Sequence, residues 1–347
     1  MIWHVIGLMS GTSLDGLDIC FVRFVKGYSW SFEIIKAETV LYSDTLHHQL
    51  NHAIDLPAEQ LLELHSEYGF FLGKTVKNFI EKHNLKNIDL IASHGHTVYH
   101  QPQKKFTFQI GDGRAIKLET GIPVVYDFRS QDVLMGGNGA PLVPIGDELL
   151  FPEYDACLNL GGFSNISLRS EGKRIAFDIA PVNIVLNKLA QHFNKDFDEN
   201  GNLARNGNIN ERLLSALNSL PFYHQPHPKS LGIEWCNENI FPRLENVDSL
   251  DALATFTEHT AHQIAEVINK NHLKNVLFTG GGTCNQYLIE KISSKTQAEI
   301  MIPEKEIIDF KEALIFALMG VLRINNSINV LSSATGSPYD HSSGIIA

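Results

Sequence analysis

A polar turn near the start of the chain has the residue types of a phosphate-binding loop. The apolar run WHVIGLM is followed by the letters SGTSLDGLD. Glycine lets a backbone approach an anion closely, and turn N–H groups and hydroxyls can donate hydrogen bonds to it. We expect four residues of this turn to bind phosphate: Gly11, Thr12, Ser13 and Asp15. Asp15 and Asp18 could also orient the water shell of a phosphate-bound Mg²⁺. Solvated turns use the same residue types, so this turn alone is weak evidence of a site.

Two further glycine turns follow strand-like runs in the second half of the chain. One is LGGFSN, with Gly161 and Gly162. The other is TGGGTCN, with Gly280, Gly281 and Gly282 before Asn285. A glycine turn between a buried strand and a helix start can bind an anion or a nucleotide. The second turn is not a P-loop, because no Gly-Lys-Ser/Thr follows it, and it lacks the full dinucleotide spacing. Three such turns together indicate a nucleotide site more specifically than any one of them.

Two carboxylates are candidates for proton transfer or ligand binding. Asp178 follows the apolar residues of FDIAP and precedes a predicted helix. A carboxylate at a strand end can act as a general base, although a helix cap or a surface ion pair is the commoner role of such an Asp. Glu312 lies in KEAL, at the start of an apolar helix, where a capping or surface role is the simpler interpretation.

A histidine cluster, HGHTVYH, follows the short buried run IDLIAS. If this segment were one strand, His94 and His96 would lie on one face, which would suit a metal ion. Polar contacts to a substrate at a strand end are the alternative that we prefer for these histidines and His100, because no carboxylate motif accompanies them.

Length and composition restrict the class of protein. The 347 residues exceed the size at which single cores stop growing, so two domains are expected. The net charge of −11 argues against an electrostatic nucleic-acid binder. The four cysteines form no Cys-x-x-Cys pair, and no run is long or apolar enough for a membrane span. With no signal peptide visible at the N-terminus, we expect a cytoplasmic location without a membrane partner.

The predicted elements repeat in two halves. Each half opens with strand, glycine turn, strand and third strand, and then continues with helices and shorter buried strands. The glycine- and proline-rich segment around MGGNGAPLVP suggests a boundary, so we expect an N-terminal α/β domain at 1–135 and a C-terminal one at 136–347. The last helix could pack back on the first domain. Pattern alone leaves two hairpins in one mixed sheet as an alternative to duplication.

The motif order resembles that of the anhydro-N-acetylmuramic acid kinases. The resemblance begins with GLMSGTSLDGLD and continues through SHGHTVYH, QIGDG, VVYDFRSQDV, GGNGAPLVP, LNLGGFSNIS, DENGNLARNG, PKSLGIEW, TGGGTCN and FKEALIFALMG. It covers nearly the whole chain. It implies an α/β fold of two duplicated RNase H-like domains, the actin/Hsp70/hexokinase fold, around a cleft for nucleotide and sugar.

The resemblance also implies a reaction and assigns residues to it. Such kinases use ATP and Mg²⁺ to open the 1,6-anhydro bridge of anhydro-N-acetylmuramic acid and phosphorylate the freed oxygen during cell-wall recycling. Asp178 would deprotonate the attacking water, the glycine turns would hold phosphates, and Gly280 to Gly282 with Asn285 would flank the adenosine. The resemblance places six residues at the sugar: His94, His96, Asp127, Pro181, Asn183 and Glu312. It also implies that two copies can form a homodimer.

Three departures from the family pattern leave the substrate open. This chain has DIAPVN at 178–183 where the family usually has Asp-Thr-Gly-Pro-Gly-Asn, His96 where Gln is frequent, and Ile233 where Arg is common. A kinase for another anhydro sugar, such as levoglucosan, and a non-catalytic nucleotide-binding relative are therefore alternatives. A metallohydrolase built on the histidines is a third.

Overall fold

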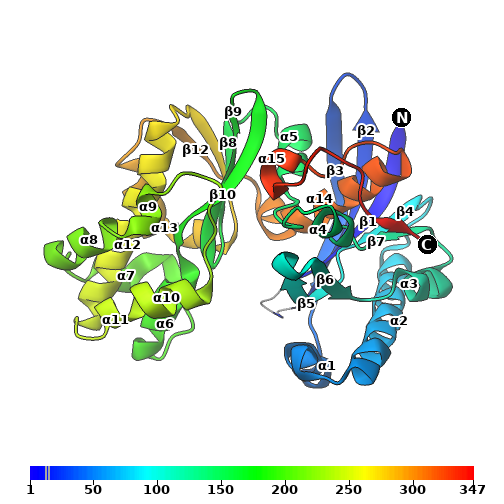
Figure 1. Ribbon diagram of the computed structural model, residues 1–347, viewed down its shortest axis with the longest axis horizontal. Coiled ribbons are helices and arrows are strands. Elements are labelled where there is room, and N and C mark those ends of the chain that lie inside the picture. The colour runs from blue at the N-terminus through cyan, green and yellow to red at the C-terminus, as the bar shows by residue number, and fades with distance from the viewer. Residues whose placement is uncertain (12–13, 15) are drawn as a thin grey trace. The chain divides into compact units, whose positions relative to one another are not determined.

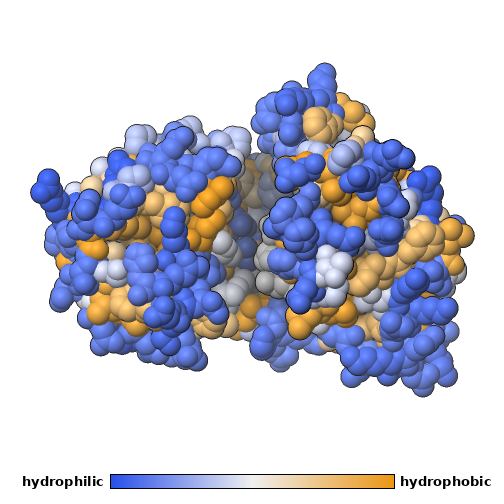
Figure 2. Space-filling view, turned by 90° about the horizontal axis from the view of Figure 1, so that it is seen from below, coloured by the Kyte–Doolittle hydropathy of each residue, from blue (hydrophilic) through white to orange (hydrophobic). Residues whose placement is uncertain are grey.

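The computed structural model describes residues 1–11, 14 and 16–347 and divides them into two compact units. Unit 1 consists of Met1–Leu150 together with Phe310–Ala347, and unit 2 is Phe151–Asp309. Figure 1 shows the elements of each unit, and Figure 2 shows that hydrophilic and apolar residues are interspersed on the surface of both. Among the residues described, no helix is long and apolar enough to cross a membrane.

The sheet of unit 1 combines an antiparallel meander with parallel strands. Its order is β13-β7-β4-β1-β2-β3, in which β1 pairs with β2 and β2 with β3 antiparallel, while β1, β4 and β7 run parallel. The strands are β1 (Ile2–Ser10), β2 (Leu17–Lys26), β3 (Trp30–Val40), β4 (Leu90–Ser93), β7 (Val124–Tyr126) and β13 (Ile345–Ile346). A separate two-stranded sheet pairs β5 (His96–Gln101) with β6 (Phe106–Ile110).

Side-chain alternation along β1 sends its residues to two helical layers. Ile6 and Leu8 join one core cluster with Tyr68 and Leu72 of α2 (Ala58–His83). Gly7, which points to the other face, lies against α14 (Lys305–Ile324), where an added Cβ would come within 2.1 Å of the Ala313 carbonyl oxygen. Helices therefore cover both faces of the sheet. The remaining helices of unit 1 are α1 (Asp44–Asn51), α3 (Gly113–Thr120), α4 (Ser130–Leu134), α5 (Pro144–Leu150) and α15 (Ser332–Thr335).

Unit 2 repeats the strand order of unit 1. Its sheet runs β10-β9-β8-β11-β12, with two antiparallel pairs followed by parallel strands, so the pattern third-second-first-fourth-fifth occurs in both units. The strands are β8 (Ala156–Leu160), β9 (Phe163–Ser170), β10 (Lys173–Pro181), β11 (Asn275–Thr279) and β12 (Glu299–Met301). This repetition confirms the predicted fold class of two duplicated RNase H-like α/β domains, and it excludes the alternative of two hairpins in one mixed sheet.

One large apolar cluster holds unit 2 together. It joins inward-facing residues of the sheet, such as Leu158 and Phe278, to Phe256 of the long helix α12 (Ser249–Lys270) and Leu288 of α13 (Gln286–Ser293). The other helices of the unit are α6 (Asn183–Ala190), α7 (Asn202–Arg205), α8 (Glu211–Asn218), α9 (Pro221–His224), α10 (Ile233–Asn239) and α11 (Phe241–Leu244).

The compact units divide at Leu150 rather than at the expected residue 135, and residues 310–347 belong with the first unit. Buried polar contacts explain why the segment after residue 135 stays with unit 1. The fully buried Asp132 carboxylate accepts a hydrogen bond from the Gly139 N–H (2.6 Å) and another from Thr335 Oγ1 (2.8 Å). The buried Lys311 ammonium pairs with Asp147 at 2.7 Å. Burial of unpaired charges is costly, so these contacts hold the crossover and the C-terminal segment together.

Candidate active site

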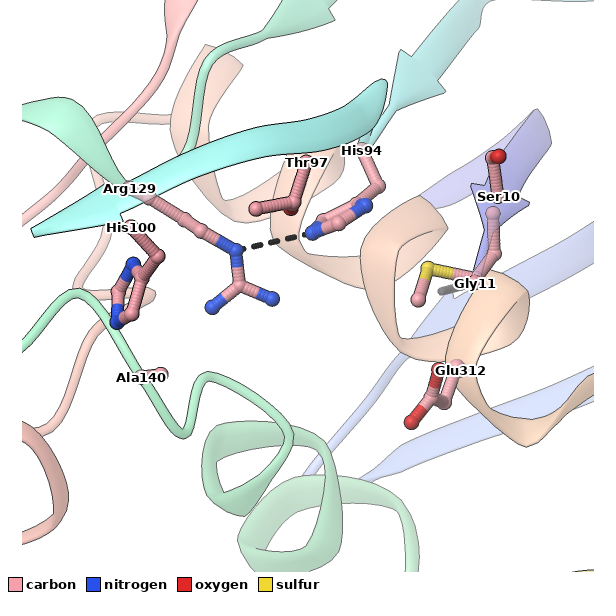
Figure 3. Close-up of a pocket in the computed structure, with 9 residues that line it drawn as sticks. Ser10, Gly11, His94, Thr97, His100, Arg129, Ala140 and Glu312 are labelled. Atoms are coloured by element: carbon pink, nitrogen blue, oxygen red, sulfur yellow. Dashed lines mark hydrogen bonds between the residues drawn. The ribbon is translucent and has the colours of Figure 1, made fainter. Parts of the chain in front are cut away.

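The parallel strands of unit 1 end beside a pocket. Because β1, β4 and β7 run parallel, the residues after them meet at one edge of the sheet, which is where open α/β sheets bind ligands. The pocket has a volume of about 510 Å³, within the usual range for small-molecule sites. It is lined by Met9, Ser10, Gly11, His94, Thr97, His100, Arg129, Ala140 and Glu312 (Figure 3).

The Arg129 side chain is held in this pocket by two acceptors. Its Nε donates to His94 Nε2 at 2.9 Å, and its Nη1 donates to the Gly139 carbonyl at 2.6 Å. Figure 3 shows its guanidinium lying between His94 and His100. Burial lowers the pKa of Arg129 to about 10, opposed by the charge of Glu312, so the side chain is a cation at neutral pH.

The same contacts define the state of His94. An arginine Nε–H only donates, so His94 Nε2 must accept, and Nδ1 then donates to the Gly95 carbonyl at 2.9 Å. Burial and the neighbouring Arg129 charge lower the pKa of His94 well below its ordinary value. His94 is therefore a neutral residue with both ring nitrogens engaged, which leaves no lone pair for a metal ion.

His96 lies behind the pocket rather than in its lining. The chain turns between β4 and β5 at Gly95, whose φ is +73°, so the expectation of one strand carrying His94 and His96 on a single face is wrong. The buried His96 Nδ1 lies 3.1 Å from Ser10 Oγ, which accepts a hydrogen bond from the Tyr42 hydroxyl at 2.7 Å. Burial lowers the pKa of His96 to about 4. In this arrangement a neutral His96 holds the last residue of β1, directly before the predicted phosphate turn.

Glu312, in α14, places a carboxylate in the pocket lining, where the side chain is exposed. Desolvation by the surrounding protein raises the pKa of this carboxyl. The positive charges of Arg129 and Lys311 oppose the shift. The surface or capping role considered for this residue is therefore replaced by a place in the pocket lining.

The predicted phosphate turn is described only in part. Thr12, Ser13 and Asp15 lie outside the described residues. Gly11 lines the pocket, and Asp18, in β2, accepts a hydrogen bond from Thr39 Oγ1 at 2.6 Å. In the part of the chain that the structure describes, no three His, Cys, Asp or Glu side chains are grouped to hold a metal ion.

Unit 2 brings two predicted glycine turns together at the same edge of its sheet. Gly161 and Gly162 follow β8, and Gly280 follows the parallel neighbour β11. Asn183 joins them, because its N–H donates to the Gly161 carbonyl (3.3 Å) and its Nδ2 to the Leu160 carbonyl (3.4 Å). A Cβ at Gly281 would meet open space, whereas one at Gly282 would lie 2.9 Å from the Leu160 carbonyl oxygen. Close packing therefore requires Gly282, and Gly281 lies where a ligand could approach.

Asn285, Pro181 and Asp127 have structural roles where the structure describes them. Asn285 Oδ1 accepts from the Leu288 N–H at 3.0 Å and so caps α13. Pro181 is buried at the end of β10, where its carbonyl accepts from Thr260 Oγ1 at 3.3 Å. Asp127, with φ of +52°, accepts from the Ser130 N–H at 3.2 Å at the start of α4 and does not line the pocket.

Asp178 lies within β10, at a bulge, rather than at the strand end that we expected. The ladder with β9 shifts register between Asp178 and Ala180. Its Oδ2 accepts from the Leu231 N–H at 2.7 Å, and its own N–H donates to the Lys229 carbonyl at 3.0 Å. Burial raises the pKa of the carboxyl, and the Leu231 N–H partly offsets this. A half-buried carboxylate with a raised pKa is suited to accept a proton.

Comparison with known proteins places these sites in a family. The anhydro-N-acetylmuramic acid kinase family matches residues 3–347. This chain belongs to that family. It is 35% identical to the anhydro-N-acetylmuramic acid kinase of Francisella tularensis subsp. novicida, over 96% of this chain and 95% of that protein. It is 33% identical to the Haemophilus influenzae enzyme of the same name, over 99% and 97% of the two chains.

Solved structures resemble the chain more distantly. The Acidaminococcus fermentans (R)-2-hydroxyglutaryl-CoA dehydratase component A gives a TM-score of 0.48 at 12% identity, over 92% of this chain and 97% of that chain. A ROK family glucokinase from Streptomyces griseus gives 0.43 at 10%, over 92% and 99%. These TM-scores are too low to support a fold assignment, which rests on the repeated strand order of the two units.

In this member of the anhydro-N-acetylmuramic acid kinase family, the residues of segment 178–183 that depart from the family pattern are buried in the core of unit 2. Ile179, Ala180 and Val182 are at most 1% exposed and belong to the apolar cluster of unit 2. They therefore add packing inside the unit rather than bulk at its surface. Ile233, in contrast, is 40% exposed at the start of α10.

Local sequence patterns in this family member do not identify the polar residues that converge on the pocket from several elements. Arg129 lies in the motif VVYDFRSQDV, whose residue types alone do not indicate a ligand contact. Its position after β7, at the edge where β1 and β4 also end, was the available signal. Ser10 and Thr97 carried no distinguishing pattern of their own.

Proposed function

We propose that this chain is an ATP-dependent kinase that opens 1,6-anhydro-N-acetylmuramic acid and phosphorylates it to N-acetylmuramic acid 6-phosphate. The observation that carries the proposal is the family match over residues 3–347, with relatives of that name aligned over nearly their whole length. The half-buried Asp178, whose pKa is raised, supports a catalytic rather than a purely nucleotide-binding role.

In the proposed reaction, Asp178 takes a proton from water as the water oxygen attacks the anomeric carbon. The bond from that carbon to the bridging oxygen breaks. The released oxygen then attacks the γ-phosphorus of ATP, and ADP leaves. A carboxyl whose pKa is raised by burial is a better proton acceptor than an exposed one.

The pocket of unit 1 supplies complementary charges for a polar, acidic sugar. Arg129 is a fixed cation, and an arginine fork suits carboxylate or phosphate oxygens. Glu312, beside it, could orient a sugar hydroxyl or a water molecule, because its carboxyl accepts hydrogen bonds when ionised. We propose that both residues contact substrate.

We propose that the turns with Gly11 and with Gly161 and Gly162 hold the nucleotide phosphates, and that the turn from Gly280 to Gly282, where Gly281 is open to an approaching ligand, flanks the adenosine. Mg²⁺ usually keeps several waters and needs only one or two carboxylates besides the phosphates, so a complete protein cage is not required. Asp18, held by Thr39, and the open Glu312 carboxylate fit such an outer shell, and their charges influence one another. When bound, the ion would neutralise phosphate charge.

One departure favours a second candidate substrate. Ile233 stands exposed where the family commonly has Arg, so a contact to an acidic substituent is missing at this position. An anhydro sugar without that substituent, such as levoglucosan, is the corresponding alternative.

The experiment that tests the proposal measures ADP release by the purified chain with Mg²⁺-ATP and each sugar separately. We expect release that depends on anhydro-N-acetylmuramic acid, with one phosphorylated sugar per ADP. Release with levoglucosan alone would favour the second candidate. If ATP binds but neither sugar stimulates release, the chain is a non-catalytic relative and the proposal is wrong.

A further inference from the structure

A short segment at 227–231 covers the edge of the unit 2 sheet beside Asp178. We call this segment the strap. In the sheet that the described residues form, β10 is the outermost strand, so its outward N–H groups have no further strand to bind. The strap forms two hydrogen bonds with Asp178. The Lys229 carbonyl accepts from the Asp178 N–H (3.0 Å), and the Leu231 N–H donates to Asp178 Oδ2 (2.7 Å).

Lys229 fastens the middle of the strap to α9. Its ammonium donates to the Phe222 carbonyl at 3.1 Å and to the Tyr223 carbonyl at 3.4 Å. It also lies 4.6 Å from the centre of the Phe222 ring, within cation–π range. These carbonyls belong to the one-turn helix α9, and the Phe222 carbonyl also accepts from the Gln225 N–H at 3.2 Å, so Lys229 adds a second donor there. Lys229 therefore binds this helix through its ammonium while its backbone holds Asp178.

Helix α9, whose carbonyl groups bind Lys229, is itself held by hydrogen bonds to the core of unit 2. The Tyr223 hydroxyl lies 2.8 Å from Nε2 of His259, a fully buried residue of α12, and His259 Nδ1 lies 2.6 Å from Asn218 Oδ1. Burial lowers the pKa of His259 to about 3, so the imidazole is neutral in this network. At the other end of the strap, the His227 ring stacks on Phe177, the residue before Asp178, with centroids 5.4 Å apart.

From this geometry we propose that Lys229 is a positioning residue: by tying the strap to α9, it keeps the Leu231 N–H on the Asp178 carboxylate and fixes the direction of that carboxylate. The inference rests on the proposed role of Asp178 as base. Lys229 acts through the strap and does not itself touch the reacting atoms.

Two consequences follow for Asp178 when the strap is released. Loss of the Leu231 N–H removes the hydrogen bond that lowers the pKa of this carboxyl and leaves burial to raise it further. The carboxylate also becomes free to rotate away from its productive direction, which lowers kcat more than it changes the KM for ATP.

Direct charge effects must be separated from positioning. Two charged residues of α12, Glu266 and Lys270, lie near enough to Lys229 to shift its pKa. Lys270→Met removes a neighbouring exposed positive charge without touching the carbonyls of Phe222 and Tyr223, and it serves as the matched control. Lys229→Arg keeps a cationic donor and serves as the conservative variant.

The test is an NMR titration of the full chain labelled with ¹³C at the aspartate carboxyl carbon, with Asp178→Asn to assign the signal. We expect Lys229→Met to raise the pKa of Asp178 by about one unit, the size expected for weakening one charge-assisted hydrogen bond. Lys229→Arg and Lys270→Met should leave the pKa within about 0.3 units of the parent value. The acid limb of the kcat/KM profile should move with the NMR value, with kcat reduced about tenfold at neutral pH.

An unchanged pKa of Asp178 in Lys229→Met, or an equal rise in Lys270→Met, would overturn the inference. A second measurement needs no variant: the Leu231 amide signal of the parent chain should titrate with the same midpoint as the Asp178 carboxyl. A Leu231 amide that does not respond to this titration would also overturn it. Because both NMR readouts need no turnover, failure of the proposed reaction would appear separately, as absent sugar-dependent ADP release.

Discussion

At the residue scale, the polar groups of both units are defined by what holds them. Arg129 is fixed by a histidine nitrogen and a carbonyl oxygen, and Asp178 by a backbone N–H. Preorganised groups of this kind contribute to catalysis because they need no rearrangement when charge develops.

Asp178→Asn should abolish turnover while leaving the fold intact. The amide oxygen can still accept from the Leu231 N–H, but it cannot take a proton, so we expect kcat to fall at least 10³-fold, in line with loss of a general base. Calorimetric ATP binding should survive. Turnover within tenfold of the parent would contradict the role of Asp178.

The same variant has a pH-dependent effect on stability. Because the folded state raises the pKa of Asp178, ionisation of this carboxyl costs more free energy in the folded than in the unfolded chain. We therefore expect the Tm of Asp178→Asn to equal or exceed that of the parent at pH 7, with the gain disappearing as the pH falls towards 4. A lower Tm at pH 7 would show that the carboxylate stabilises the fold.

His96 is expected to tolerate the residue that is frequent in its family. A glutamine side chain carries both a donor and an acceptor, so it can replace His96 Nδ1 as the partner of Ser10 Oγ, and His96→Gln should keep kcat/KM within about threefold. His96→Leu leaves the buried Ser10 hydroxyl without this partner and should cost about 1–3 kcal/mol of unfolding free energy. Chemical denaturation measures the difference, and equal stability of the two variants would contradict it.

Acid should destabilise the parent more than His96→Gln. The folded state lowers the pKa of His96 from its ordinary 6.5 to about 4, so its contribution is complete above pH 6.5 and declines as the pH falls towards 4. Denaturation at pH 7 and pH 4.5 should therefore show a smaller loss in the variant, by about 2 kcal/mol.

At the element scale, the sheet of unit 1 depends on a glycine contact with α14. Gly7→Ala would drive a Cβ to 2.1 Å from the Ala313 carbonyl oxygen, a backbone atom that can move only with its helix. We expect a loss of about 2–3 kcal/mol in unfolding free energy. Gly27→Ala, where the nearest atom lies 4.0 Å away, is the matched control and should change stability by less than about 0.5 kcal/mol.

Elements with long periodic patterns were predicted well from the sequence. Apolar residues that recur every three and four positions over 57–83 predict the helix that the structure shows as Ala58–His83, and the pattern of 31–40 predicts the strand Trp30–Val40. The helix α1 was not identified, because only Leu50 of its eight residues is buried and it has little apolar pattern. The three-residue strand β12 is also too short to be predicted from alternation.

Turn residues can be predicted from local sequence, whereas the grouping of side chains from distant segments cannot. Gly161, Gly162 and Gly280 were recognisable from their turns. Arg129 and Glu312 line one pocket although they are far apart in sequence, and no spacing rule connects them. The Leu231 contact to Asp178 likewise depends on a segment that crosses a strand edge, which the sequence pattern does not specify.

At the scale of the whole molecule, two units with the same strand order carry different polar groups at equivalent strand ends. The turn after β1 in unit 1 and the turn after β8 in unit 2 occupy the same place in the repeated order. The unit 1 pocket adds histidines and arginine, whereas unit 2 adds asparagine and glycines. Duplication supplied two frameworks, and the loops and strand ends distinguish them.

The units should differ in their ability to fold when expressed separately. Residues 151–309 form one continuous segment with its own apolar cluster, so we expect this fragment to unfold cooperatively in circular dichroism. Residues 1–150 lack α14, which leaves one sheet face uncovered, and should show no cooperative transition. Cooperative unfolding of the 1–150 fragment would contradict this prediction.

The return of the C-terminal segment to unit 1 has a consequence for synthesis on the ribosome. Unit 2 ends at Asp309, so all of its residues leave the ribosome before residues 310–324 of α14, and its core can form while the sheet of unit 1 still lacks its second helical layer. Glu312 emerges with that helix, so the pocket gains its carboxylate only near the end of translation. A ribosome that stops early would therefore release a chain with a finished second unit and an incomplete pocket, a product that cellular proteases can distinguish by its exposed sheet.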